Sequence, residues 1–382
     1  TDTGSSIRVP SSANGVVGIR PTFDLVSTDG VIKFEETRDV VGVITKYVSD
    51  NAIVLDIIDN SDTKYEDYLN KDLSGIKIAV INGFMNPNTN STSIDYGKTD
   101  RFIYNMMTEA ITDLEKLGAE IIYLDNFYLT YKFDATTMCY NFNEYIKGTS
   151  SKIKSLDDLI KNGGYTQYIN GYNGYYCDHD YKETSTYQNY LSIRNNNIKL
   201  ANNRFEEYEI DAIIYPTLKT KLYTNDEAKY SQIYTPSSST APLIGFPAIS
   251  IPMGFYEGLP YGLEIMAQSN NEKIIYQIAS AYENLTNYYQ TPSIAPSLYE
   301  IPEEVNNLLE YYDTYKNDSK YENINNEVQD YLINFDGNVD NINNLINKYD
   351  EESLIPEPKI ENNNYNYIIL LLGGLVAVII IK

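Results

Sequence analysis

The chain has 382 residues and a formal net charge of −24 at pH 7. This length can hold a sizeable core in one large domain or two. The acidic balance argues against nucleic acids and anionic membrane surfaces as partners, because phosphate groups bind to basic protein surfaces.

The first ten residues are small and hydroxyl-rich and run into a similar stretch up to Thr22, a composition that is also typical of flexible linkers. Interleaved charges at Asp2, Arg8 and Arg20 and apolar residues from Val16 to Ile19 argue against a linker. A turn of small residues lets the backbone approach a bound group and point successive N–H donors at it. A serine in such a turn combines a hydroxyl with neighbouring donors, which an acyl-transfer site requires.

Thr1 to Thr22 resembles the core of the amidase signature family, whose pattern reads roughly GTDxGGSIRxPxxxxGxxGxKPT. The resemblance implies that Ser6 is the nucleophile that forms an acyl-enzyme. It also implies an oxyanion hole made by the backbone N–H groups of Thr3, Gly4, Ser5 and Ser6.

Asp2 and Arg8 are implied to be a charged pair that braces this loop, which is a structural role. Ser5 departs from the second glycine of the pattern. The backbone donor survives that change, whereas the added side chain could narrow the acyl pocket.

The resemblance also implies a catalytic lysine, which acts through a second serine with a cis peptide bond. Both lie upstream of the nucleophile in the family. Because the chain starts one residue into the motif without Met, we interpret it as an N-terminally truncated member and expect this polypeptide to be inactive. No cofactor and no metal are implied.

The pattern of apolar residues predicts an alternating α/β arrangement. A turn at Asp29-Gly30 is expected between two strand-like stretches, followed by a helix over 49–58. A strand at 77–81, a helix over about 99–117 and a strand at 121–124 predict a parallel crossover, with helices on both faces of the sheet.

Further elements are predicted in the second half of the globular part. Ser155 is the expected N-cap of a short helix. The remaining predictions are a strand at 210–217, two strands at 248–252 and 261–266 joined by a turn, and a helix over 271–285.

Residues 240–266 resemble a second family pattern, NLAGLPAISVPAGF…GLPVGLQLIG. The implied fold is the amidase signature fold, an α/β mixed sheet flanked by helices on both faces, over residues 1–290. A C-terminal helical tail is expected to follow it.

The two cysteines, Cys139 and Cys177, are either a disulfide in a secreted protein or two buried thiols in a cytosolic one, and we favour the disulfide. The single histidine, His179, lies in a Cys-Asp-His-Asp run that superficially resembles a metal site. It lacks a second pair at zinc spacing, so a surface loop is favoured. The tyrosine-dense loop 163–187 could line a substrate mouth, although compositional bias explains it better.

The C-terminal part is predicted to be separate. Residues 291–366 are interpreted as an acidic, partly helical stalk, whose charged face is most simply solvated. Residues 367–382 are almost continuously apolar and are predicted to be a membrane-spanning helix rather than a buried core helix, although a full span needs about 20 residues. This predicts a single-pass protein with its catalytic domain outside the cytoplasm; secretion or a lipid anchor are the alternatives.

The sequence therefore favours an amide-bond hydrolase acting on a small-molecule or peptide amide. One rival is a non-catalytic adaptor that keeps the fold, which Ser5 and the absent base suggest. Another is an amidotransferase A-type subunit that works with partner subunits.

Overall fold

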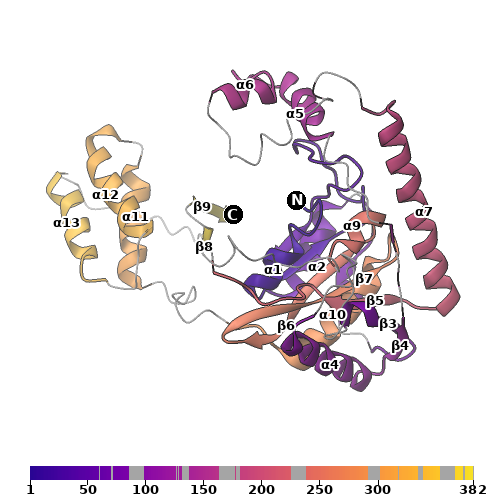
Figure 1. Cartoon of the computed structure of the whole chain (residues 1–382). Helices are drawn as coiled ribbons and strands as arrows, with labels where there is room; N and C mark the ends of the chain where they lie inside the picture. The colour runs from indigo at the N-terminus through magenta and orange to yellow at the C-terminus, as the bar shows by residue number, and fades with distance from the viewer. Residues whose placement is uncertain are drawn as a thin grey trace. The chain divides into compact units, whose positions relative to one another are not determined.

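Seven strands form one mixed sheet in the order β2-β1-β6-β7-β5-β3-β4 in the computed structural model (Figure 1). The structure describes residues 1–59, 61–69, 72–85, 99–125, 127, 129–130, 137–162, 177, 181–224, 238–290, 302–316, 318–333, 339–352, 366–372 and 375–381. These divide into two compact units, Thr1–Gln290 and Thr291–Lys382. The strands of the sheet are β1 (Val17–Arg20), β2 (Val43–Thr45), β3 (Lys77–Ile81), β4 (Glu120–Leu124), β5 (Ala212–Pro216), β6 (Ala248–Tyr256) and β7 (Leu259–Ala267).

Parallel and antiparallel pairs both occur in this sheet. β3 pairs in parallel with β4 and with β5, whereas β6 and β7 form an antiparallel hairpin that joins β5 to β1. A helix connects β3 to β4, so the predicted crossover is confirmed. The helices among the described residues of the first unit are α1 (Arg8–Asn14), α2 (Val48–Ile58), α3 (Asn82–Met85), α4 (Arg101–Lys116), α5 (Thr137–Lys147), α6 (Leu156–Lys161), α7 (Ser185–Tyr208), α9 (Thr240–Ile244) and α10 (Glu272–Thr286), with a 3-10 turn η1 at Tyr65–Tyr68.

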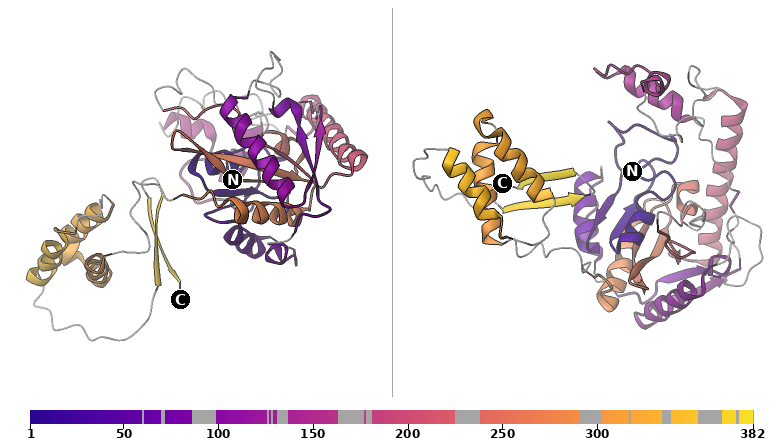
Figure 2. Two further views of the ribbon diagram at one scale, coloured as in Figure 1. Left: turned by 90° about the horizontal axis from the view of Figure 1, so that it is seen from below. Right: turned by 60° about the vertical axis from the view of Figure 1, so that its left-hand side comes forward.

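Each face of the sheet is covered by helices, because alternate residues of a strand point to opposite faces. Ile78 and Val80 of β3 belong to a core that includes α2, α4 and α10. Ala79 and Ile81 belong to a second core with α7 and α9, and α7 is the long helix along one side of the unit in Figures 1 and 2. The predicted fold class is therefore confirmed.

Most local predictions are confirmed, with small shifts at the element ends. The Ser155 side chain caps α6 by accepting a hydrogen bond from the Asp158 amide at 3.1 Å. The prediction of strands beside Asp29-Gly30 is wrong, since residues 25–32, all described, form a turn at Gly30 but no strand. Val26 pairs with Asp59 as an isolated bridge, so this stretch lacks the neighbouring ladder that a strand requires.

Cys139 and Cys177 form a disulfide, which confirms the favoured pairing of the two cysteines. The bond lies in a small apolar cluster with Phe142 of α5 and Leu156 of α6. Asn143 ties the same parts together, since its Nδ2 donates to the Cys177 carbonyl at 2.9 Å and its Oδ1 accepts from the Leu156 amide at 2.8 Å. Three buried residues form a weak core, so the covalent link contributes much of the stability of this cluster.

Replacing both cysteines by serine is expected to destabilise the α5–α6 region by about 2–4 kcal/mol, because the bond closes a long loop in the unfolded chain. Hydrogen exchange of residues 137–161 with and without reductant measures this effect. Reductant should have no effect on the double variant, and equal exchange in the oxidised wild type and the variant would contradict the prediction.

Glu283 of α10 holds the first turn of α2. Its two carboxylate oxygens accept hydrogen bonds from the Val48 amide at 3.0 and 3.1 Å. Burial raises the pKa of Glu283 to about 7, and the neighbouring carboxylate of Asp50 adds to the rise. A raised pKa means that the folded protein binds this proton more tightly than the unfolded chain does.

The contribution of Glu283 to stability is therefore greatest below the unfolded pKa and decreases as pH rises to about 7. The decrease is expected to be on the order of 1–2 kcal/mol, since the side chain is only partly buried and water screens it. Glu283→Gln should remove this part of the pH dependence, as measured by urea unfolding at pH 5 and pH 8. Replacement of the exposed Glu109 by Gln is the control, and an unchanged slope in Glu283→Gln would refute the assignment.

In its described residues, the second unit contains the helices α11 (Glu303–Tyr315), α12 (Glu322–Ile333) and α13 (Ile342–Glu352), with a 3-10 turn η4 at Ser319–Tyr321. The apolar stripes of α11 and α13 pack against each other through Val305, Leu308, Ile342 and Leu345. The helical tail expected from these stripes is thus present. Its helices share a core of their own.

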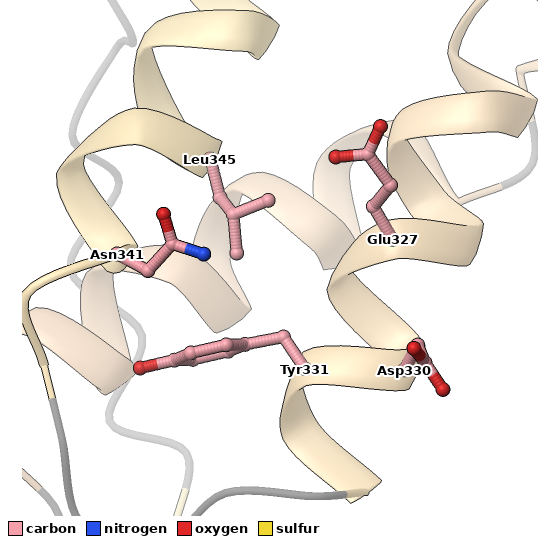
Figure 3. Close-up of a pocket in the computed structure, with 5 residues that line it drawn as sticks. All are labelled: Glu327, Asp330, Tyr331, Asn341 and Leu345. Carbon is pink, nitrogen blue, oxygen red and sulfur yellow. The ribbon is translucent and has the colours of Figure 1, made fainter.

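A shallow pocket lies between α12 and α13 (Figure 3). Tyr331 and Leu345 form its apolar part, and Glu327, Asp330 and Asn341 line its rim. Glu327 already pairs with Lys348 of α13. This pocket is therefore part of a solvated, acidic helix surface.

The prediction of a membrane-spanning helix at residues 367–382 is wrong in its secondary structure. Strands β8 (Asn366–Leu372) and β9 (Leu375–Ile381) pair antiparallel there. The sequence offers the reason, since two β-branched and aliphatic runs flank a Gly-Gly pair, which favours a hairpin over a helix. In the part of the chain that the structure describes, no helix has the length and apolar character needed to cross a bilayer.

Candidate active site

Ser6 lies in the turn that leads into α1, and its side chain is exposed. Residues 1–7 form an irregular loop, which we call the nucleophile loop. The helix follows because the Val9 amide donates to the Ser5 carbonyl at 2.9 Å and the Ser11 amide donates to the Ile7 carbonyl at 3.1 Å. The hydroxyl of Ser6 is thus held at the start of a helix and open to solvent.

Four consecutive backbone amides of the nucleophile loop have no acceptor among the described residues. No described residue accepts a hydrogen bond from the amides of Thr3, Gly4, Ser5 or Ser6. The amides on either side are occupied, since Asp2 donates to the Val40 carbonyl at 3.0 Å and Ile7 donates to a carboxylate oxygen of Asp2 at 3.2 Å. Unpaired N–H groups beside an exposed hydroxyl can bind an oxyanion.

The Arg8 side chain connects the nucleophile loop to the interior of the first unit. Its Nε and Nη2 donate to the two carboxylate oxygens of Asp2 at 3.2 and 3.3 Å, and Nη2 also donates to the Gly4 carbonyl at 3.1 Å. On the other side, Nη1 donates to the Ser238 carbonyl at 2.6 Å and to Oε1 of Glu264. The Arg8 side chain is fully buried. The predicted bracing pair of Asp2 and Arg8 is therefore in contact.

Asp2 is fully buried and has a second cationic neighbour, Arg20 of β1. Arg20 Nη1 donates to the Asp2 carbonyl at 2.9 Å, and its Nη2 donates to the Arg38 carbonyl at 2.9 Å. Burial alone would raise the pKa of Asp2, but Arg8 and Arg20 outweigh it and lower that pKa below its ordinary value. Asp2 is therefore a stable carboxylate, whereas burial lowers the pKa of Arg20 to about 10.

Glu264 of β7 and Tyr215 of β5 complete this buried network. The Tyr215 hydroxyl donates to Oε1 of Glu264 at 2.9 Å, the same oxygen that Arg8 contacts. Burial raises the pKa of Glu264 despite the adjacent Arg8 guanidinium, and it raises the pKa of Tyr215 as well. These groups are therefore suited to holding structure, whereas the Ser6 side chain in the loop above them is exposed.

Sequence reasoning noted Arg20 as a charge without giving it a role, and it missed Glu264 and Tyr215. All three occupy strands in which most other residues are apolar, and that contrast was the available signal. Tyr187 of the tyrosine-dense stretch is buried beside Tyr190. His179 and the tyrosines between 165 and 176 lie outside the described residues.

An α/β fold that holds an exposed serine in such a loop is compatible with acyl transfer. Comparison with known proteins identifies the family. The family model described as Amidase matches residues 1–275, so the chain belongs to the amidase family. This confirms the resemblance that the two motifs indicated.

Among curated proteins, the chain is similar to the A subunit of glutamyl-tRNA(Gln) amidotransferase. The Exiguobacterium sp. protein is 29% identical over 334 residues, which are 77% of this chain and 65% of that protein. The Geobacillus stearothermophilus protein is 31% identical over 327 residues, 76% of this chain and 64% of that protein. The chain therefore spans a little under two thirds of the length of these relatives.

Among solved structures, the chain resembles native peptide amidase from Stenotrophomonas maltophilia, with a TM-score of 0.60, 23% identity and coverage of 77% of this chain and 63% of that chain. It also resembles an amidase family protein from Bacillus anthracis, with a TM-score of 0.59, 21% identity and coverage of 76% and 57%. At this identity the likeness shows the fold alone.

Proposed function

We propose that the protein is an amide-bond hydrolase in which Ser6 is the nucleophile. The Ser6 Oγ attacks the amide carbonyl carbon while a base takes its proton. In the family that the motif resembles, this base is a lysine acting through a second serine, and both lie upstream of the nucleophile. The C–N bond then breaks, the amine leaves with a proton, and water hydrolyses the acyl ester to the acid and free Ser6.

One observation carries this proposal: an exposed serine hydroxyl stands beside four backbone amides for which no described residue is an acceptor. The carbonyl oxygen of the substrate gains negative charge in the tetrahedral intermediate. Amide donors held in place beforehand stabilise that charge without reorganisation. Arg8, Asp2 and Arg20 supply the rigidity, since they tie the loop to the sheet and to residues 38–40.

A fluorophosphonate serine trap tests the assignment in a chain that carries the upstream lysine and serine. The expected result is one adduct, located at Ser6 by peptide mass spectrometry and absent from Ser6→Ala. Absence of any adduct would favour the adaptor alternative, and an adduct on another serine would refute the role of Ser6.

The names of the curated relatives favour a second candidate, the A-type subunit of an amidotransferase. Both candidates share the acyl-enzyme step and differ in the fate of the ammonia. A panel of amides with ammonia detection separates them, because a hydrolase turns over amides alone, whereas an amidotransferase component requires its partner subunits.

Attachment to a membrane through residues 367–382 stays a prediction. Deletion of these residues is expected to move the protein from the membrane pellet to the supernatant, as measured by fractionation and immunoblotting. Equal partition with and without the segment would contradict it.

A further inference from the structure

The sheet contributes one acidic side chain to the network beneath the nucleophile loop, that of Glu264. It is fully buried and comes from β7, 256 residues after Arg8. Its Oε1 accepts from both Arg8 Nη1 and the Tyr215 hydroxyl, whereas no described residue bonds to its Oε2. Both hydrogen bonds that Glu264 accepts from described residues therefore go to Oε1.

That oxygen and the Ser238 carbonyl hold one end of the Arg8 guanidinium, and the opposite end holds Asp2 and the Gly4 carbonyl. A guanidinium is planar and rigid, so fixing Nη1 also fixes the direction of Nη2. Glu264 therefore helps to determine where Arg8 Nη2 lies, and so where the Gly4 carbonyl oxygen is held.

The Gly4 carbonyl and the Ser5 amide belong to the same peptide unit. This unit is planar and trans, so its C=O and N–H point in opposite directions. When Arg8 holds the Gly4 oxygen at 3.1 Å toward the buried network, the Ser5 N–H points away from that network. This N–H is one of the four amides for which no described residue is an acceptor.

We propose that Glu264 is a positioning residue for the acyl-transfer reaction: acting through Arg8, it fixes the plane of the Gly4–Ser5 peptide and so directs the Ser5 N–H toward the oxyanion. The inference rests on the proposed function and deepens it. Tyr215 supports Glu264 by donating to the same oxygen.

Two variants at one position isolate this role. Glu264→Gln keeps an acceptor oxygen in place, and glutamine is also the residue of the second motif that the sequence resembles. Glu264→Leu removes the acceptor but retains an apolar side chain in the core. We therefore expect the glutamine variant to behave like the wild type and the leucine variant to loosen the nucleophile loop.

Hydrogen exchange of the 382-residue chain measures the loosening without requiring activity. In Glu264→Leu, the amides of Asp2, Ile7, Val9 and Val40, all bonded in or to the loop, should exchange at least about tenfold faster. Exchange in β3 and β5 should stay unchanged, which separates local loosening from global unfolding. Wild-type exchange at the four amides in Glu264→Leu would overturn the inference, as would equal loosening in Glu264→Gln.

Turnover supplies the second readout, in a chain that carries the upstream lysine and serine. Glu264→Leu should lower kcat about 10- to 100-fold with KM within about twofold, because a misdirected donor weakens binding of the transition state. Glu264→Gln should have the same kcat as the wild type. If Glu264→Leu does not fold, Tyr215→Phe provides a milder test, with a smaller rise in exchange at the same amides.

The two proposals fail in distinguishable ways. Undiminished turnover in Ser6→Ala would refute the proposed function whatever Glu264 does. A fall of kcat in Ser6→Ala combined with unchanged kcat and exchange in Glu264→Leu would refute the positioning role alone.

Discussion

Ser6→Ala is expected to lower kcat for amide hydrolysis by about 10⁴- to 10⁶-fold in a chain that carries the upstream lysine and serine. The variant loses the atom that forms the acyl-enzyme, and amide donors alone cannot replace a covalent step. The substitution removes one oxygen from an exposed side chain, so the fold should be unaffected. Release of ammonia or amine under saturating substrate measures the effect.

Ser192 offers a matched control, since it is an exposed serine on α7. Ser192→Ala should leave kcat and the melting temperature unchanged. A loss of less than tenfold in Ser6→Ala would point to another nucleophile, and the fluorophosphonate adduct would then identify it.

Arg8→Met is expected to lower the free energy of unfolding by about 3–5 kcal/mol. Methionine fills much of the same volume, but it leaves the carboxylates of Asp2 and Glu264 buried without their common cation. Removing one partner of a buried ion pair is costly because the remaining charge stays desolvated. Urea unfolding at pH 7 measures the change.

Two further arginine variants separate charge from geometry. Arg8→Lys keeps the charge but lacks the planar fork that reaches Asp2, Gly4 and Glu264 together, so an intermediate loss is expected. Arg204→Met removes a partly exposed pair with Glu207 and should cost less than about 1 kcal/mol. Equal effects of Arg8→Met and Arg204→Met would contradict the central role of Arg8.

The fold was largely predictable because its signals are local. The apolar run of β3 and the helical stripe of α4 each predict one element, and the strand–helix–strand order predicts a parallel crossover. The same reasoning failed near residue 30, where strand-like residues lack a neighbouring ladder. It failed again after residue 366, where total hydrophobicity outweighed the Gly-Gly pair that favours a hairpin.

The candidate site was predictable only in part. Ser6, Asp2 and Arg8 lie within one short motif, and a resemblance to that motif named all three. Glu264 and Tyr215 belong to other strands, and only the folded sheet brings them to Arg8. A buried acid on an apolar strand indicates an unseen cation, but the sequence does not say which one.

The contact between Arg8 and Glu264 joins residues near the two ends of the first unit. Contacts between such distant positions form late, since most of the intervening chain must first be ordered. During synthesis the ribosome delivers Ser6 long before β7 emerges, so the nascent chain displays the serine without its supporting sheet. The contact between Arg8 and Glu264 can therefore form only after translation has passed residue 264.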